Sequence, residues 1–161
     1  MPAAPIRSLL FVCTGNICRS PTAEGVMRQR LQAAGLGEVV RVDSAGTHGY
    51  HVGDPPDPRS IAAARRRGVD IAGLAARRVV VADFQRFDLI LAMDAGHYQH
   101  LRRMAPAGSE QRVRLFLDFC PDGVSGRDVP DPYYDGPAAF EQVLDLVEDA
   151  ADGLLAVLRR G

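Results

Sequence analysis

Lysine and tryptophan are absent from this sequence of 161 residues, and cysteine occurs only three times. The 19 basic residues are therefore all arginine, and 20 acidic residues balance them to a formal net charge of -1. A chain without a basic excess lacks the general attraction to polyanions that nucleic-acid binding uses, although single arginines can still bind an anion locally. We therefore expect no nucleic acid among its partners.

Long apolar runs are missing as well. No stretch approaches the 18 residues that a membrane-spanning helix needs, and residues 1–7 lack the basic-then-apolar pattern of a signal peptide. The odd number of cysteines, two of them five residues apart, argues against a secreted disulfide framework. These absences predict a cytoplasmic protein that is not bound to a membrane. The length fits a single domain over residues 1–161.

Short apolar runs alternate with helix-like patterns along the chain. The apolar runs predict buried strands at residues 8–13, 39–43, 88–93 and 112–117. Apolar residues at helical spacing, with Pro, Gly and Asp at the ends, predict helices near residues 21–34, 58–67, 95–105 and beyond 137. The fold class expected from this alternation is α/β: a small doubly wound sheet of four parallel strands with helices on both faces. Ligands of such sheets bind beyond the carboxyl ends of the strands.

A cysteine-containing loop follows the first predicted strand, with the sequence Cys13-Thr14-Gly15-Asn16-Ile17-Cys18-Arg19-Ser20. Gly15 and Asn16 tolerate positive φ angles, which suits a tight loop before a helix. Successive backbone N–H groups of such a loop bind a tetrahedral anion, and Arg19 adds a planar fork for two oxygens. The same donors favour the thiolate form of Cys13. The pattern predicts a phosphate loop after the first strand, with residues 14–19 binding phosphate and Cys13 attacking phosphorus.

Two simpler interpretations of these residues remain open. Cys13 could be an inert cysteine at the end of a buried strand, which is a common place for cysteine. Alternatively, Cys13 and Cys18 could join His97 and His100 in a zinc site, because the spacing of the two cysteines is within the allowed range.

The string VCTGNICRSPTAE at residues 12–24 resembles the signature loop of the low-molecular-weight protein tyrosine phosphatases. Supporting matches extend over nearly the whole chain, at residues 43–46, 52–59, 92–94 and 131–135. The resemblance implies that Cys13 is the nucleophile, that Arg19 binds phosphate and that Asp131 is the general acid. It also implies that Ser20 and Ser44 hold the loop by hydrogen bonds around Asn16. Catalysis in this family is independent of metal ions and cofactors.

The segment Asp131-Pro132-Tyr133-Tyr134 follows the fourth predicted strand, so it belongs to the same sheet edge as the loop. A carboxyl group placed there can protonate the leaving group and then activate water to hydrolyse a phosphocysteine. Tyr133 and Tyr134, with Tyr50 opposite and Ile17 beside the phosphate, are expected to form a slot for an aromatic leaving group.

The predicted function is therefore hydrolysis of phosphotyrosine in proteins through a covalent phosphocysteine. The resemblance also implies a cognate tyrosine kinase as a partner and inhibition by phosphate-like oxyanions. A protein arginine phosphatase remains an alternative, since that relative differs by a Thr at the position of Ile17. So does an arsenate reductase of the same fold, although it uses two further cysteines and only Cys120 is present. A non-catalytic phosphoprotein-binding module would lack the nucleophile or the acid.

Sensitivity to oxidation is a further expectation. A thiolate at Cys13 is prone to attack by peroxide, and the resulting sulfenic acid condenses with a nearby thiol. Cys18 lies on the same small loop, so a Cys13–Cys18 disulfide is predicted.

Overall fold

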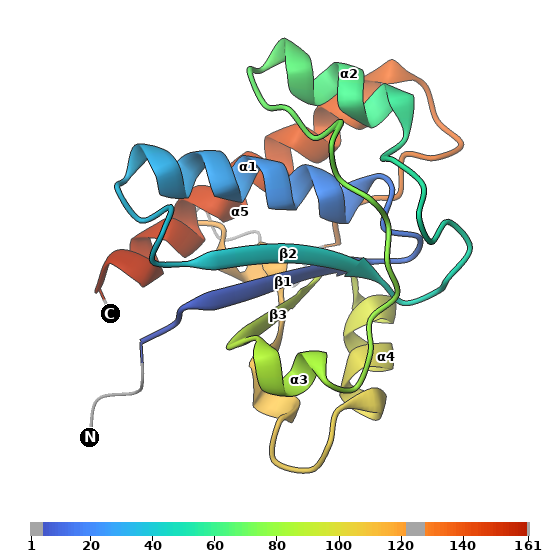
Figure 1. The fold of residues 1–161 in the computed structure, drawn as a ribbon. Helices are drawn as coiled ribbons and strands as arrows, with labels where there is room; N and C mark the ends of the chain where they lie inside the picture. The colour runs from blue at the N-terminus through green and yellow to red at the C-terminus, as the bar shows by residue number, and fades with distance from the viewer. Residues whose placement is uncertain (1–4, 122–127, 161) are drawn as a thin grey trace.

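Residues 5–121 and 128–160 are described by the computed structural model, which is a parallel sheet covered by helices on both faces (Figure 1). The strand order is β2-β1-β3-β4, and every pairing is parallel. The strands are β1 (Ser8–Cys13), β2 (Arg41–Gly46), β3 (Leu89–Ala92) and β4 (Val113–Leu115). The predicted fold class is confirmed.

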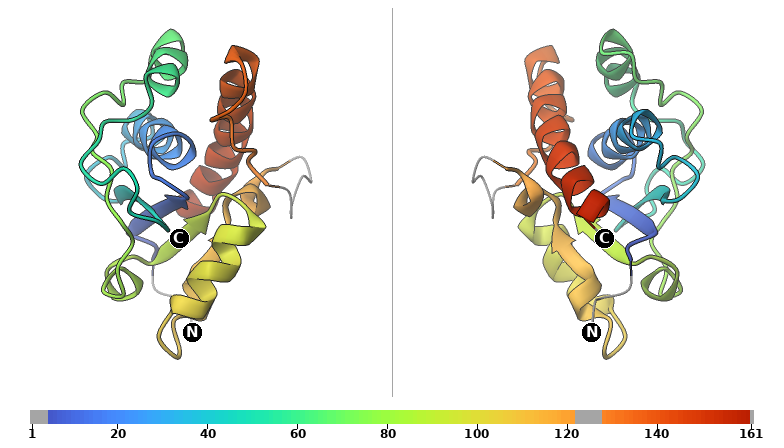
Figure 2. Two further views of the ribbon diagram at one scale, coloured as in Figure 1. Left: turned by 90° about the vertical axis from the view of Figure 1, so that its right-hand side faces the viewer. Right: turned by 90° about the vertical axis from the view of Figure 1, so that its left-hand side faces the viewer.

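Side chains of β1 alternate between two cores because successive residues of a strand face opposite sides of a sheet. Leu9 and Phe11 pack with α1 (Arg19–Ala33), α2 (Pro58–Arg66) and α5 (Pro137–Arg160). Leu10 and Val12 pack with α3 (Asp83–Arg86) and α4 (Ala95–Met104) on the other face. Figure 2 shows these two helical layers on either side of the sheet. All six residues of β1 are buried, which explains its continuous apolar sequence.

Two helices begin at aspartates, as helix N-caps commonly do. Asp57 precedes α2 and accepts a hydrogen bond of 2.8 Å from the Arg59 backbone N–H. Asp94 precedes α4 and accepts one of 2.9 Å from the His97 backbone N–H, as the sequence predicted. Gly68 follows α2 with a φ of 78°, a conformation that favours glycine.

Several predicted boundaries were wrong. The second strand begins at Arg41 instead of Val39, because the backbone N–H groups of Val39 and Val40 donate to the Leu36 carbonyl in a turn. The fourth strand ends early because a 3₁₀ helix (Phe116–Phe119) replaces its predicted end. The 3₁₀ helix Glu110–Arg112 and the short α3 were not predicted. Residues 122–127 of the predicted loop lie outside the described residues.

The chain leaves β1 toward β2 on one side and later returns to place β3 on the other side of β1. Such a reversal opens a crevice at the carboxyl ends of the strands, and the loop that follows Cys13 begins there.

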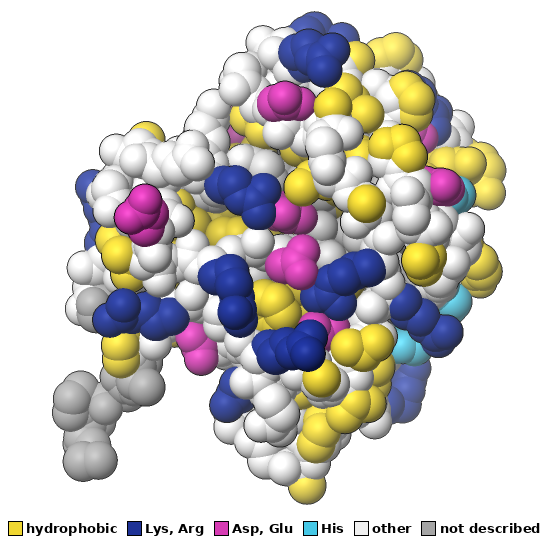
Figure 3. Space-filling model, in the orientation of Figure 1, with side chains coloured by type: hydrophobic (Ala, Val, Ile, Leu, Met, Phe, Trp, Pro, Cys, Tyr) yellow, Lys and Arg dark blue, Asp and Glu magenta, His cyan; other side chains and the backbone are white. Residues whose placement is uncertain are grey.

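Over the face in front of β2, Figure 3 shows basic and acidic side chains next to one another. Within the described ranges, no helix is long and apolar enough to cross a membrane.

Candidate active site

The loop between β1 and α1 turns tightly around Asn16, whose φ is 60°. Asn16 is the only non-glycine residue with a positive φ in residues 5–121 and 128–160. Gly46, at the end of β2, allows the loop to approach closely, since a Cβ there would lie 2.7 Å from the Thr14 carbonyl oxygen. A larger side chain at Gly46 would therefore displace the backbone of the loop at Thr14.

The Asn16 side chain is buried and makes three hydrogen bonds. Its Nδ2 donates to Ser20 Oγ at 2.8 Å and to Ser44 Oγ at 2.9 Å, and its Oδ1 accepts from the Arg77 backbone N–H at 3.0 Å. These bonds offset the cost of the left-handed backbone. The structure thus places both serines where the sequence resemblance put them, and adds Arg77.

Two charged residues extend this network from α1, and sequence reasoning missed both. Ser44 Oγ donates to Glu24 Oε1 at 2.6 Å, and Arg28 Nη2 donates to Glu24 Oε2 at 2.7 Å. Glu24 is only 3% exposed, so the arginine compensates a carboxylate that has lost its water. The four-residue spacing of Glu24 and Arg28 on a helix was the available signal.

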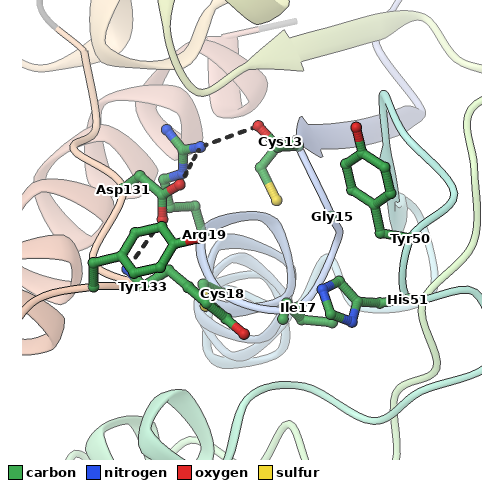
Figure 4. Close-up of a pocket in the computed structure, with 11 residues that line it drawn as sticks. Cys13, Gly15, Ile17, Cys18, Arg19, Tyr50, His51, Asp131 and Tyr133 are labelled. Atoms are coloured by element: carbon green, nitrogen blue, oxygen red, sulfur yellow. Dashed lines mark hydrogen bonds and ion pairs between the residues drawn. The ribbon is translucent and has the colours of Figure 1, made fainter.

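Cys13 lies at the floor of a pocket, with its sulfur pointing into it (Figure 4). The residue is 3% exposed, and Sγ lies 3.0 Å from Ser20 Oγ. Ser20 Oγ accepts from Asn16 Nδ2, and its hydrogen has two acceptors within reach: the Cys13 sulfur at 3.0 Å and the Ala45 carbonyl oxygen at the longer distance of 3.5 Å. The shorter of these contacts places a hydrogen-bond donor next to the sulfur at the floor of the pocket.

The pocket has a volume of about 270 Å³. Its walls are formed by the loop and by two other segments, which contribute Thr14, Gly15, Ile17, Cys18, Arg19, Tyr50, His51, Asp131, Tyr133 and Tyr134. In Figure 4, Asp131 and Tyr133 stand on one side, and Tyr50 and His51 stand on the other. The predicted slot residues are thus brought together. Asn16, predicted to bind phosphate, does not line the pocket.

His51 was not predicted to line this pocket. Its ring packs on the loop at Gly15, where an added Cβ would lie 3.0 Å from His51 Cδ2. Its Nδ1 lies 3.3 Å from Asp54 Oδ2, which holds the ring at the rim. Tyr134 is 92% exposed and meets Tyr133 edge to face, with ring centroids 4.9 Å apart. The aromatic wall therefore extends from the pocket to the surface.

Arg19 enters the pocket from the first turn of α1 and is 3% exposed. Its Nη1 donates to Asp94 Oδ2 at 2.9 Å and to the Val129 carbonyl at 3.0 Å. Burial by itself would raise the pKa of Asp94, but hydrogen bonds from the His97 backbone and from Arg19 lower it below its usual value. Asp94 is therefore ionised, and its carboxylate holds the Arg19 guanidinium in place through the hydrogen bond from Nη1.

Asp131 lies at the mouth of the pocket with a side chain that is 52% exposed. One carboxylate oxygen accepts a hydrogen bond of 3.1 Å from the Tyr133 backbone N–H. The other lies 3.7 Å from Arg19 Nη2. A carboxyl group in this position faces the same cavity as the Cys13 sulfur, so it can exchange protons with a leaving group held between them.

The zinc interpretation does not match the geometry. His97 Nε2 is hydrogen-bonded to Thr14 Oγ1 at 2.8 Å, and His100 lies beside His48 with ring centroids 6.0 Å apart. In the part of the chain that the structure describes, no group of three or more His, Cys, Asp or Glu side chains is arranged to hold a metal ion. Burial raises the pKa of Cys18 to about 12, against the smaller opposing effect of a hydrogen bond with Ser60.

Comparison with known proteins gives the same family on each count. The family model described as "Low molecular weight phosphotyrosine protein phosphatase" matches residues 8–161. A low molecular weight protein-tyrosine-phosphatase of Streptomyces coelicolor is 50% identical over 151 residues, covering 92% of each chain. One of Bacillus subtilis is 41% identical, covering 95% of this chain and 96% of its own.

Solved structures are also similar. A crystal structure of a protein tyrosine phosphatase from Entamoeba histolytica, with Hepes in the active site, superimposes with a TM-score of 0.92 at 42% sequence identity. The match covers 96% of this chain and 98% of that one. A crystal structure of the Bacillus subtilis protein gives a TM-score of 0.89 at 39% identity, covering 99% and 98%.

Proposed function

We propose, from the premise that this chain belongs to the low molecular weight phosphotyrosine protein phosphatase family, that Cys13, Arg19 and Asp131 carry out its catalysis. The chain is a protein-tyrosine phosphatase, and phosphotyrosine-containing proteins are its substrates. The observation that supports these residue roles is one cavity that holds the Cys13 sulfur, the Arg19 guanidinium and the Asp131 carboxyl group.

In the first step, the Cys13 thiolate attacks phosphorus. The S–P bond forms as the bond from phosphorus to the tyrosine oxygen breaks, and Asp131 gives its proton to that oxygen. The Arg19 guanidinium and the backbone N–H groups of the loop residues that line the pocket bind the other phosphate oxygens, over which charge is spread in the transition state. The Ser20 hydroxyl, 3.0 Å from Sγ, stabilises the thiolate before the attack.

In the second step, Asp131 acts as a base. Its carboxylate takes a proton from a water molecule, and the water oxygen attacks the phosphorus of the phosphocysteine. The P–S bond breaks, which releases inorganic phosphate and restores the Cys13 thiolate. Asp131 is then protonated again, ready for the next phosphotyrosine. The half-exposed position of this carboxyl group gives water access from the mouth of the pocket.

The pocket walls supply the selectivity. Ile17, Tyr50 and Tyr133 form the slot for the tyrosine ring, and Tyr134 extends it to the surface. Because the substrate must be made by phosphorylation, a tyrosine kinase is the proposed partner enzyme. Phosphate-like oxyanions are proposed to inhibit by occupying the loop.

Redox sensitivity is proposed for the same loop. Peroxide would oxidise Cys13 to a sulfenic acid, and Cys18 would displace water from it to form a disulfide. The high pKa of Cys18, about 12, leaves little thiolate at neutral pH, so this step is slow there. None of the cysteines, all of which lie in the described residues, is in a disulfide. A mechanism that requires a thiolate supports the proposal of a reducing, cytoplasmic location.

The experiment that tests the residue roles measures hydrolysis of a phosphotyrosine peptide with EDTA present. Cys13→Ser should abolish turnover but keep part of the vanadate binding, because backbone N–H groups supply much of the anion site. Arg19→Lys should lower kcat by about 10²-fold, since an ammonium cannot replace the planar fork. Arg103→Lys, at an exposed position of α4, is the matched control and should act like wild type.

Acid quenching during turnover should trap one phosphoryl group on Cys13, as a mass increase of the peptide that contains it. Substantial turnover by Cys13→Ser, or a strict requirement for a metal ion, would overturn the proposed mechanism.

A further inference from the structure

A histidine in the first turn of α4, His97, contacts the phosphate loop at Thr14. The sequence offers His97 only as a candidate zinc ligand, whereas in the structure the residue is 5% exposed and Nε2 lies 2.8 Å from Thr14 Oγ1. Thr14 in turn lines the pocket, and its Oγ1 lies 3.5 Å from Arg19 Nη2. The contact thus connects the start of α4 with the proposed phosphate clamp.

The direction of the hydrogen bond between His97 and Thr14 follows from the surroundings of the ring. Burial and the nearby Arg19 lower the pKa of His97 to about 4, so the imidazole is neutral near pH 7. In the described residues, Nδ1 is buried without a hydrogen-bond partner, and it lies 3.1 Å from Asp94 Oδ1. A lone pair on Nδ1 would repel this carboxylate oxygen, whereas an Nδ1–H is attracted to it.

The hydrogen of the neutral ring therefore resides on Nδ1, and Nε2 carries the lone pair. Nε2 accepts the hydroxyl hydrogen of Thr14. With its hydrogen directed at His97, Thr14 Oγ1 has only lone pairs to offer to Arg19 Nη2. The separation of 3.5 Å is at the long end of a hydrogen bond, as contacts in active sites often are before a substrate binds.

These contacts form a closed ring of four residues, joined by three hydrogen bonds between side chains and one from the His97 backbone. Asp94 Oδ2 accepts from Arg19 Nη1, Asp94 Oδ1 accepts from the His97 backbone, His97 accepts from Thr14, and Thr14 accepts from Arg19 Nη2. Nη1 uses both of its hydrogens, on Asp94 and on the Val129 carbonyl. The guanidinium edge formed by Nε and Nη2 is thus the edge left for two phosphate oxygens, and Asp131 Oδ2 lies 3.7 Å from Nη2 at the mouth of the pocket.

We propose that His97 is a positioning residue, which aligns Arg19 for two-pronged phosphate binding by fixing the orientation of the Thr14 hydroxyl. The proposal rests on the proposed role of Arg19 as the phosphate clamp. Such alignment matters most when phosphorus becomes five-coordinate, because donors must already point to where the oxygens then lie. His97 should therefore affect kcat and the binding of vanadate more than KM.

The test is a double-mutant cycle on Thr14 and His97, assayed with a phosphotyrosine peptide and with vanadate. His97→Leu and Thr14→Val should each lower kcat and weaken vanadate binding about tenfold, the value of one hydrogen bond, with KM nearly unchanged. The double variant should be no worse than either single variant, because both remove the same contact. His97→Gln should restore activity to within about threefold, since the side-chain oxygen of Gln reaches the position of Nε2.

Losses that multiply in the double variant, a change confined to KM, or failure of His97→Gln to restore kcat would each overturn the proposal. If His97→Leu does not fold, the comparison of Thr14→Val with Thr14→Ser tests the proposal instead. Thr14→Ser keeps the hydroxyl and should retain kcat, whereas Thr14→Val loses the hydroxyl and should lower kcat. The nitrogen NMR shifts of His97, assigned by their loss in His97→Gln, should report the Nδ1–H form. An Nε2–H form would contradict the argument.

Arg19→Ala in the same assays separates the two proposals. If Arg19→Ala binds vanadate as wild type does, the proposed role of Arg19 itself fails. If Arg19→Ala loses vanadate binding while His97→Leu keeps it, only the inference on His97 fails.

Discussion

Asn16 is the residue whose replacement tests the support of the phosphate loop most directly. Its buried side chain makes three hydrogen bonds, and its backbone is left-handed with a φ of 60°. Asn16→Gly removes three hydrogen bonds at about 1 kcal/mol each, so the free energy of unfolding should fall by about 3 kcal/mol. Asn16→Ala loses the same bonds but has a Cβ, which Gly lacks, and it has no side-chain amide to support the left-handed backbone; it should therefore be about 1 kcal/mol less stable than Asn16→Gly.

Urea unfolding measures both losses. With a denaturant slope of about 2 kcal/mol per molar urea, the midpoint should fall by about 1.5 M for Asn16→Gly and about 2 M for Asn16→Ala. In urea-free buffer, the inhibition constant of inorganic phosphate should rise for both variants, because the N–H groups of the loop no longer converge. The difference between the two midpoints measures the backbone strain, and the loss that both variants share measures the hydrogen bonds.

Gly35 provides the control for strain alone. It follows α1 with a φ of 76°, and a Cβ there would meet no atom within 4 Å. Gly35→Ala should cost about 1 kcal/mol of stability and leave kcat and phosphate inhibition unchanged. The reasoning is refuted if Asn16→Ala is at least as stable as Asn16→Gly, or if either Asn16 variant binds phosphate as tightly as wild type.

Three further predictions concern the pocket. Asp131→Asn should lower kcat/KM for a phosphotyrosine peptide by about 10²-fold or more but for nitrophenyl phosphate much less, because nitrophenolate leaves without a proton and kcat/KM excludes the later hydrolysis step that both substrates share; equal lowering of kcat/KM would remove Asp131 as leaving-group acid. Ile17→Thr should shift the ratio of rates toward phosphoarginine peptides by about tenfold, since an apolar side chain leaves guanidinium donors unpaired; equal wild-type rates on both peptides would contradict this. Formation of the Cys13–Cys18 disulfide after sulfenic acid has formed should accelerate about tenfold per pH unit between about pH 7 and about pH 9, because the pKa of Cys18 is about 12; mass spectrometry of quenched samples measures it, and a pH-independent rate would exclude Cys18 thiolate as the attacking group.

Part of the fold was readable from the sequence because its signals are local. The apolar run of β1, Asp94 before α4 and the apolar stripe of α5 each reflect burial or capping within a few residues. The limits of β2 were not readable. Val39 and Val40 look like strand residues, yet they form a turn on Leu36, while the less apolar residues 43–46 pair with β1 up to Cys13. Pairing with a neighbouring strand decided these limits, and no local pattern encodes it.

The sequence by itself determined the loop of residues 13–20 and its chemistry, because a nucleophile, its anion-binding backbone and an arginine all fall within eight consecutive residues. Only the tertiary structure decided what holds them in place. Asp94 and Val129 reach Arg19 across 75 and 110 positions of the chain, and His97 reaches Thr14 across 83. Contacts between such distant residues form because β1, β3 and the segment after β4 end at the same edge of the sheet. The spacing of residues along the chain does not predict which segments become neighbours there.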